Sequence, residues 1–382
     1  MKKRTAIVLC LIGCLLLILA GCGGSKDAQE AVSFDSLKSE GEIELSYAEM
    51  FKAEKLQDGY YLLTIADEDR FLLVPEGAPV PDGLDESIKV IRQPVTGLYV
   101  AASSSIDFFR QLDALSSVRM ISTEKSDWSF EDVQKAIDSE ELLYVGKYSA
   151  PDYETIVAEN CGLAIESTMI YHSPDIKEKL ETMGIPVMVE HSSYEAHPLG
   201  RMEWIKLYGI LTGKEAEADA FFEQEVKKLD GLLTDEPTNK KVAFFYVSSA
   251  GYINVRKPGD YISKMIEMAG GKYVLSDMKT DEENALSTMN MQMEEFYSRA
   301  QDADILIYNS TIEGNLDRID QLVEKNKLFA DFKAVKSGNV WCTGSNMFQQ
   351  TTGVSQMIVD LHSIIHDDAG DGADLTFLHK MK

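Results

Sequence analysis

The predicted fold depends on the stretch HPLGRMEWIKLYGILTGKEAEADAFFEQEVKKLDGLL, residues 197–233. Thr212 and Glu215 have the spacing of a capping box, which predicts that a helix begins there. Apolar residues then recur at intervals of four and three, as on one helix face: Ala218, Phe222, Val226, Leu229 and Leu233. A helix of about 20 residues is about 30 Å long, roughly the diameter of a small domain. We therefore expect a single linking helix, within residues 212–236, between two lobes.

Apolar, strand-like runs alternate with helical patterns on both sides of this helix. Such alternation is typical of parallel βα units, and roughly 340 residues exceed what one hydrophobic core usually holds. The predicted fold class is α/β, with two parallel-sheet lobes joined by a single long linking helix and a ligand cleft between them. The expected lobes are residues 43–211, which begin with β-rich edge structure, and residues 237–366; a tail, 367–382, follows.

The N-terminus predicts export and lipid anchoring. Three basic residues precede an apolar run over residues 6–20, and Leu19, Ala20 and Gly21 then lead to Cys22. This pattern indicates a signal peptide over residues 1–21, because the run is shorter than the ~20 residues that a membrane span needs. Its end resembles a bacterial lipobox, which implies lipidation of Cys22. We expect residues 22–42 to form a flexible tether on the outer face of the cell membrane.

Charge and cysteine content restrict the partners. The formal net charge is −26, so nucleic acid and anionic lipid headgroups are poor partners. Beyond the predicted signal peptide and Cys22, the chain has Cys161 and Cys342, one on each side of the linking helix. They are either free thiols or a disulfide between the lobes. No Cys-x-x-Cys spacing indicates a structural metal or redox site.

Candidate binding residues follow from the position of the strands. In open parallel sheets, ligands bind in the crevice beyond the carboxyl ends of the strands. The loops at these ends are rich in aromatic residues and hydrogen-bonding groups, which suit a bulky polar or chelated ligand. The candidates are Ser104, Tyr148, Glu166, Tyr171, His172 and Arg201 from the first lobe, and Tyr246, Asn254, Arg256, Asn309 and Phe348 from the second.

Arg201 has two possible anionic partners. It lies at the predicted start of a helix, where the helix dipole disfavours a cation. Its partner is either a nearby carboxylate, Glu203 or Glu195, or a carboxylate of the ligand. Arg256 is the corresponding candidate in the opposite lobe.

The sequence contains no catalytic assembly that we can identify. It has no Gly-x-Ser-x-Gly elbow, phosphate-binding loop or His-Glu-x-x-His motif. We therefore expect a binding protein without a covalent cofactor. Histidines leave a second possibility, a site for bare Zn²⁺ or Mn²⁺ built from His172, His191 or His197 with Glu190. His362 and His366 lie four residues apart, but we expect them on a solvated helix face.

The chain resembles the substrate-binding lipoproteins of ATP-binding-cassette (ABC) importers, in the branch that takes up ferric siderophores, haem and cobalamin. The resemblance covers residues 43–366. It is carried by Ser103-Ser-Ser, residues 108–115, Gly184-Ile-Pro-Val, Pro198-Leu-Gly-Arg-Met-Glu-Trp-Ile, residues 265–271 and Ala303-Asp-Ile-Leu-Ile. It implies a monomeric receptor without enzymatic activity that passes a chelated iron complex to the transmembrane subunits of a permease.

One position departs from that family. Its members commonly dock on the permease through a Glu in a loop of the first lobe, and here Ala150 stands at that position. Asp152 or Glu154 are the possible substitutes. The remaining alternative is a lipid-anchored adhesin or enzyme on the same fold.

Overall fold

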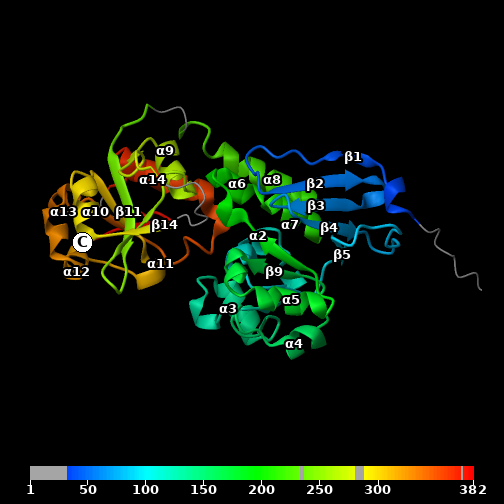
Figure 1. The fold of residues 1–382 in the computed structure, drawn as a ribbon. Helices are drawn as coiled ribbons and strands as arrows, with labels where there is room; N and C mark the ends of the chain where they lie inside the picture. Colours follow the sequence, from blue (N-terminus) through cyan, green and yellow to red (C-terminus); the bar gives the residue numbers. More distant parts are fainter. Residues whose placement is uncertain (1–31, 233–235, 280–287, 371–372) are drawn as a thin grey trace, which may run out of the picture.

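The computed structural model describes residues 32–232, 236–279, 288–370 and 373–382. The predicted signal peptide and Cys22 lie outside these residues. In Figure 1 the first lobe lies on the right and the second on the left, with helix α6 (Pro198–Glu203) between them.

The first lobe contains the predicted parallel sheet. Its 5 strands have the order β10-β9-β6-β7-β8, and all neighbours are parallel. Their bounds are β6 Leu98–Val100, β7 Val118–Ile121, β8 Leu143–Tyr144, β9 Ala164–Ser167 and β10 Val187–Glu190. The connecting helices are α2 Ile106–Gln111, α3 Glu131–Asp138, α4 Tyr153–Ala158 and α5 Pro174–Thr182. The alternation of strand and helix in the sequence therefore becomes an all-parallel sheet.

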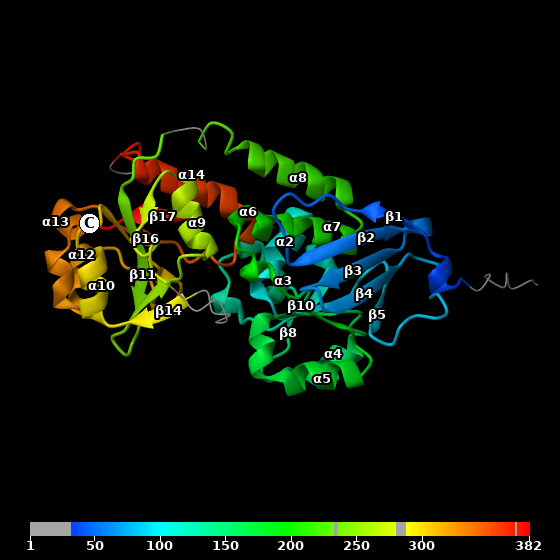
Figure 2. The ribbon, with the colours of Figure 1, turned by 45° about the horizontal axis from the view of Figure 1, so that its top comes forward.

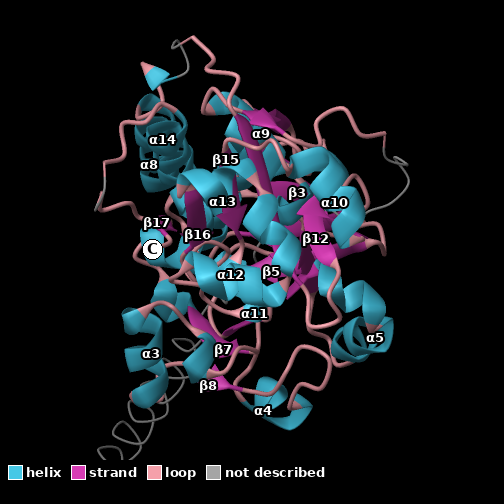
Figure 3. Cartoon of the chain, turned by 90° about the vertical axis from the view of Figure 1, so that its left-hand side faces the viewer, coloured by secondary structure: helices cyan, strands magenta, loops and turns pink. Residues whose placement is uncertain are grey.

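The second lobe has a mixed sheet. Strands β11 (Lys241–Val247), β15 (Ile305–Tyr308) and β16 (Val340–Thr343) are parallel, and the short β13 (Lys272–Tyr273) pairs parallel with β11. Three further strands pair antiparallel: β12 Ile253–Arg256, β14 Thr288–Met291 and β17 Leu378–Lys380. Figure 3 views the molecule from the side of this lobe, with helices α10 Met293–Ala300, α12 Ile319–Lys325 and α13 Lys333–Ser337 toward the viewer.

The C-terminal residues belong to this second sheet. We had expected residues 367–382 to be a tail, but β17 pairs with β16, and the flanking Phe377 and Met381 are buried. These residues pack against the sheet because the apolar side chains of Phe377 and Met381 are buried there. The predicted boundary at residue 366 therefore does not separate these residues from the lobe.

The N-terminal part of the chain forms a third sheet. The strands β1 Ser39–Glu42, β2 Phe51–Leu56, β3 Tyr61–Ile65, β4 Asp69–Val74 and β5 Ile88–Arg92 pair in sequence order. The first three pairs are antiparallel and β4–β5 is parallel. We call this unit the N-terminal sheet; it is drawn in blue to cyan in Figure 1. The predicted β-rich edge is therefore a separate sheet that does not extend the parallel one. It also begins earlier than expected, because β1 lies within residues 22–42, and the prediction of a flexible tether is wrong for Ser39–Glu42.

The linking helix is shorter than predicted. Helix α7 (Ile205–Thr212) ends at Gly213, whose φ of +68° is the left-handed conformation that ends many helices, and α8 begins at Glu215 and ends at Lys227. Thr212 cannot cap α8, because its hydroxyl donates to the carbonyl of Tyr208 (2.7 Å) in the preceding helix. The predicted capping box is wrong for this reason. The 13 residues of α8 span about 20 Å.

Helix α8 packs on α7 and reaches the second lobe. Figure 2 shows α8 above α7, with one end beside α14 (Val354–Ile365). At that end, the buried carboxylate of Glu225 accepts a hydrogen bond from the Ser355 hydroxyl of α14. The helix therefore connects the lobes through side chains as well as through the chain itself.

Two buried carboxylates fasten the N-terminal sheet to α6. Glu203, at the end of α6, accepts hydrogen bonds from the backbone N–H groups of Ser46 (2.9 Å), Tyr47 (2.8 Å) and Ala48 (2.9 Å). Its carboxylate also lies 3.1 Å from the ammonium of Lys206. Since an ionised carboxylate is costly to bury without partners, this concentration of donors is what permits its burial.

The second carboxylate, Glu195, continues the same pattern. It accepts hydrogen bonds from the backbone N–H groups of Glu49 (2.9 Å) and Met50 (2.9 Å) and from the indole of Trp204 (2.8 Å). We call Glu195 and Glu203 the carboxylate clamp. The clamp satisfies five successive backbone donors, residues 46–50, that would otherwise need other partners.

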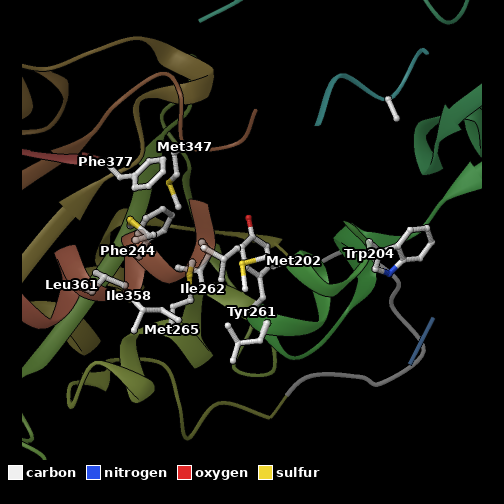
Figure 4. Packing of buried hydrophobic residues seen from close by; sticks show 14 of the residues in the cluster. Met202, Trp204, Phe244, Tyr261, Ile262, Met265, Met347, Ile358, Leu361 and Phe377 are labelled. Carbon is white, nitrogen blue, oxygen red and sulfur yellow. The ribbon is translucent and has the colours of Figure 1, made fainter. Parts of the chain in front are cut away.

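A continuous hydrophobic core crosses the lobe boundary at α6. It joins Met202 and Trp204 of the α6–α7 segment to Tyr261 of α9 (Tyr261–Met268) and to Ile358 of α14. Figure 4 shows this packing, with Met202 beside Tyr261. Because protein interiors are close-packed, this shared core restricts movement of one lobe against the other.

We expect Glu203→Gln to destabilise the protein by roughly 3 kcal/mol, because it weakens the acceptor of buried donors and leaves Lys206 without its near partner. Urea unfolding followed by circular dichroism would measure the change. The control is Glu223→Gln, which removes a charge from an exposed position of α8. Equal stability of the Glu203 variant and the control would contradict the role given to the clamp.

Candidate functional site

Two arginines from opposite lobes approach one tyrosine ring at the lobe boundary. The guanidinium carbon of Arg201, in α6, lies 4.1 Å from the centroid of the Tyr261 ring, and that of Arg256, in β12, lies 5.6 Å from it. Arg256 also lies 5.1 Å from the ring centroid of Phe348. These distances are typical of cation–π contacts. The boundary therefore combines two cations and two aromatic rings, three of which the sequence analysis selected.

The two arginines differ in their ionic partners. Arg256 lies 3.5 Å from the carboxylate of Asp260. Arg201 has no ion pair or side-chain hydrogen bond among the described residues, because both carboxylates suggested for it, Glu203 and Glu195, belong to the clamp. Burial raises the pKa of the nearby Glu190 carboxyl, and the charge of Arg201 partly offsets that rise. Arg201 is 6 % exposed and has no ionic partner among the described residues, and such burial of a cation is costly, so Arg201 is a candidate anion ligand.

A polar row continues from Arg256 across the second sheet. Tyr246 of β11 pairs in register with Asn254 of β12, and Asn254 pairs with Asn290 of β14. The Asn254 side-chain amide donates to the Asn290 carbonyl oxygen (2.9 Å). Since alternate residues of a strand share a face, Asn254 and Arg256 point to the same side of the sheet. The structure therefore brings Tyr246, Asn254 and Arg256 together, as one side of a binding surface requires.

On the first lobe, a tyrosine and a histidine meet beyond the ends of β9 and β10. The Tyr171 hydroxyl lies 3.1 Å from Nε2 of His191, whose Nδ1 lies 2.9 Å from the Val189 carbonyl. The ring of Tyr194 lies 5.9 Å from that imidazole. Tyr171 is 53 % exposed, whereas burial lowers the pKa of His191. Both nitrogens of the His191 imidazole are therefore engaged, and the exposed Tyr171 phenol is the group of this pair that a ligand can reach.

Five predicted residues take other positions. The ring of Tyr148 packs with Tyr153 and Cys161 against a second hydrophobic cluster of the first lobe. Asn309 caps the short helix α11 (Ser310–Glu313) by accepting hydrogen bonds from Thr311. Ser104 contributes its carbonyl to the lobe contact, Glu166 is fully buried inside the first lobe, and His172 is exposed beside Tyr171. Their strand-end positions are as expected, but their side chains do not join the arginines.

Segment 349–352 of the second lobe is hydrogen-bonded to the first. The side chain of Gln349 accepts from the backbone N–H of Ser129 (2.8 Å), and the Thr351 hydroxyl donates to the Ser104 carbonyl (3.0 Å). The carboxylate of Asp107 accepts from the N–H of Thr352 (2.9 Å). The lobes are thus in contact, and the cavity beside Arg201 and Tyr261 measures only about 20 Å³.

The second possibility, a site for bare Zn²⁺ or Mn²⁺, receives no support from the side-chain positions. Within the described ranges, no three His, Cys, Asp or Glu side chains are placed to hold a metal ion together. His197 stacks on Tyr47 (4.6 Å between ring centroids) and accepts from the Leu199 N–H. Glu190 instead accepts from the Ser192 N–H.

The structure also shows the state of the two thiols and of the C-terminal histidine pair. Cys161 and Cys342 are both free, and burial raises the pKa of each thiol to about 11. The rings of His362 and His366 stack, with centroids 3.9 Å apart. His362 is buried, so the expectation of a solvated face was wrong there.

Two contributors were missing from the sequence-based list, Tyr261 and His191. Tyr261 is the first residue of α9, behind the capping Asp260, whereas the strand-end rule selects loops. Tyr261 follows Arg256 closely in the sequence, but this is a weak signal, because the contact of Tyr261 with Arg201 depends on how the lobes meet. His191 had been considered only as a metal ligand.

The profile of the periplasmic binding protein family matches residues 103–347, well over half of the chain. This chain belongs to the periplasmic binding protein family. The matched segment begins after the N-terminal sheet and contains α6, α8 and the residues around Tyr261.

Several relatives and solved structures are similar to the chain. An uncharacterized lipoprotein of Methanocaldococcus jannaschii is 28% identical over 334 residues, which is 84% of this chain and 78% of the relative. A periplasmic haem-binding protein of Vibrio cholerae has a TM-score of 0.57 at 17% identity and covers 70% of this chain and 98% of its own. The petrobactin-binding protein of Bacillus subtilis has a TM-score of 0.56 at 16% identity, with 71% and 92% covered. These likenesses confirm the two-lobed α/β fold.

Family membership confirms the prediction of a solute-binding protein and not an enzyme. The relatives named lipoproteins agree with the expectation of a lipoprotein. Among the described residues, no helix is long and apolar enough to cross a bilayer.

The buried carboxyl of Glu166 has no hydrogen-bond partner in the part of the chain that the structure describes, and this burial should make stability depend on pH. Burial raises the pKa of this carboxyl from 4.5 to about 8. The folded state therefore binds a proton that the unfolded state releases, so stability should fall as pH rises from about 4.5 to about 8. We expect Glu166→Gln to remove this part of the slope in urea unfolding measured across that range. Exposed Glu178→Gln is the control, and a slope equal to that of the control would contradict the prediction.

Proposed function

We propose that this protein is a lipid-anchored receptor that binds a chelated iron complex between its lobes and delivers it to an ABC permease. The observation that carries the proposal is the pair Arg201 and Arg256, one from each lobe, at the ring of Tyr261. An anionic ligand held by both arginines would bridge the lobes.

The chemistry of these side chains suits a conjugated, anionic chelate. Guanidinium groups form paired hydrogen bonds with carboxylates, and aromatic rings such as Phe348 pack against flat ligands. On the first lobe, Tyr171 offers a phenol next to the His191 imidazole. A tyrosine phenolate is one of the ligands that proteins use for haem iron, and His191 would orient the Tyr171 phenol. This combination favours a haem-like or ferric siderophore complex.

The names of the similar structures state which ligands those proteins bind, and several of these ligands are iron complexes, which supports the proposal. These structures include the haem-binding and petrobactin-binding proteins described above. Another, from Haemophilus influenzae, is named a molybdate binding protein. An oxyanion also suits two arginines, so molybdate belongs in the binding test as a competing ligand.

For docking on the permease, we propose Glu154. Ala150 stands where a docking Glu was expected, and the carboxylate of Asp152 is already used to cap α4, where it accepts from the N–H groups of Glu154 and Thr155. The side chain of Glu154 is exposed. It is therefore the one of the two substitutes whose carboxylate remains available to a partner.

We expect Arg201→Ala to weaken binding of the cognate iron complex by about tenfold or more, because it removes a charge-assisted contact. Titration of the purified protein with haem and with a panel of ferric siderophores, followed by tryptophan quenching, would measure the dissociation constants. Arg201→Lys should recover only part of the affinity, since an ammonium lacks the planar fork.

The control is Arg299→Ala, which removes an exposed arginine paired with Glu295 in α10. It should bind like the wild type. Absence of binding across the whole panel, or binding of molybdate alone, would exclude the iron-complex proposal. Normal binding by Arg201→Ala would show instead that this arginine only supports the lobe contact.

Anchoring is tested separately. Cys22→Ala should release the protein from the membrane fraction in its native host, because the thiol that accepts the lipid is gone. Fractionation with immunodetection would measure the distribution, and the exposed Glu178→Ala variant serves as the control. Retention of the Cys22 variant in the membrane would contradict the lipid anchor.

A further inference from the structure

A second cavity lies away from the lobe boundary, between the N-terminal sheet and the α7–α8 helix pair. Its volume is about 700 Å³, within the range of small-molecule sites. All the predicted binding residues are described, and none of them lines it. Part of its wall comes from residues 43–61, which precede the segment that the family profile matches. The cavity therefore requires the N-terminal sheet, which the profile does not cover.

The wall of this cavity has an aromatic and aliphatic part. Tyr47 and Tyr61 come from the N-terminal sheet and its loop, Ile210 from α7, and Phe222 and Val226 from α8. The Tyr47 ring lies edge-on to Phe222, with centroids 6.2 Å apart. Such a surface can bury the apolar body of a ligand.

The rest of the wall is mainly acidic. The lining includes five carboxylates and two lysines: Glu44, Glu215, Asp219, Glu223 and Asp230 against Lys206 and Lys227. Lys206 is already occupied, 3.1 Å from Glu203 and 3.8 Å from Asp219. Burial raises the pKa of Tyr61, and the negative charge of Glu215 raises it further. The acidic side chains therefore act on the aromatic part of the wall. An anion or an anionic lipid headgroup would be repelled here.

The chain itself provides an example of the interaction that a ligand could make. The Lys206 ammonium lies 5.0 Å from the ring centroid of Phe222, next to carboxylates. A cation over an aromatic face, neutralised by acidic side chains, is a favourable arrangement for organic ammonium groups.

We propose that this cavity is a second binding site, which takes a small organic cation with an apolar body. The apolar part would pack on Tyr47, Phe222 and Val226, and the cationic part would face Asp219 and Glu223. The site is independent of the proposed function, because it shares no residue with the arginine pair.

The test uses phenyltrimethylammonium as the probe and tert-butylbenzene as its neutral isostere, with the full-length protein in calorimetric titrations. We expect saturable binding of the cation, with one site per chain, and binding of the isostere weaker by about tenfold or more. Equal affinity for both probes, or no binding of the cation, would overturn the proposal.

Variants locate the site. The double variant Asp219→Asn/Glu223→Gln should weaken cation binding about tenfold, whereas Glu178→Gln/Glu294→Gln, which removes two exposed charges from α5 and α10, should not. Val226→Trp should abolish binding by filling the cavity, with unfolding measured to confirm that the variant is folded. Equal losses in the two double variants, or binding by folded Val226→Trp, would place the cation elsewhere. Arg201→Ala should bind the cation normally, which separates this outcome from failure of the proposed function.

Discussion

The carboxylate clamp is the interaction on which the arrangement of this protein depends. Glu195 and Glu203 lie on either side of Arg201 in the sequence, and both are held by backbone N–H groups of residues 46–50. Their burial would be unfavourable without those donors. The clamp thereby attaches the N-terminal sheet to α6 and engages the two carboxylates that had been expected to pair with Arg201. Arg201 is left to contact Tyr261 of the other lobe.

The same helix joins the lobes in a second way. Met202 of α6 belongs to the core that continues into α9 and α14, and segment 349–352 is hydrogen-bonded to the first lobe. Asp107, which accepts from Thr352, is also paired with Arg110, and its burial raises its pKa. Movement between the lobes has to break packed and polar contacts together. A binding protein built in this way should undergo small hinge movements and not wide opening.

Charge is distributed unevenly over the molecule. The chain as a whole carries a formal charge of −26, yet the lobe boundary presents Arg201 and Arg256. The cavity beside α8 has the opposite character, with carboxylates around Phe222. Because local fields decide which ion a site accepts, the overall acidity does not prevent an anionic ligand at the boundary. The two places favour ligands of opposite charge.

The sequence by itself determined the two α/β lobes, since the alternation of strands and helices is local and buried strands follow from it. It also selected Arg201, Arg256, Tyr246 and Asn254 as candidate binding residues, from their expected positions near strand ends or the helix start. It made the linking helix too long, and its start at Thr212 was wrong because a capping-box pattern ignores the left-handed turn at Gly213.

Only the tertiary structure decided what these residues contact. The backbone partners of Glu203 are residues 46–48, which lie 155 to 157 positions away in the sequence. No local pattern encodes such partners. Tyr261 reaches Arg201 only because α9 packs on α6 across the lobe boundary. Local periodicity specifies which elements form, whereas the satisfaction of buried charges and donors specifies how they are joined.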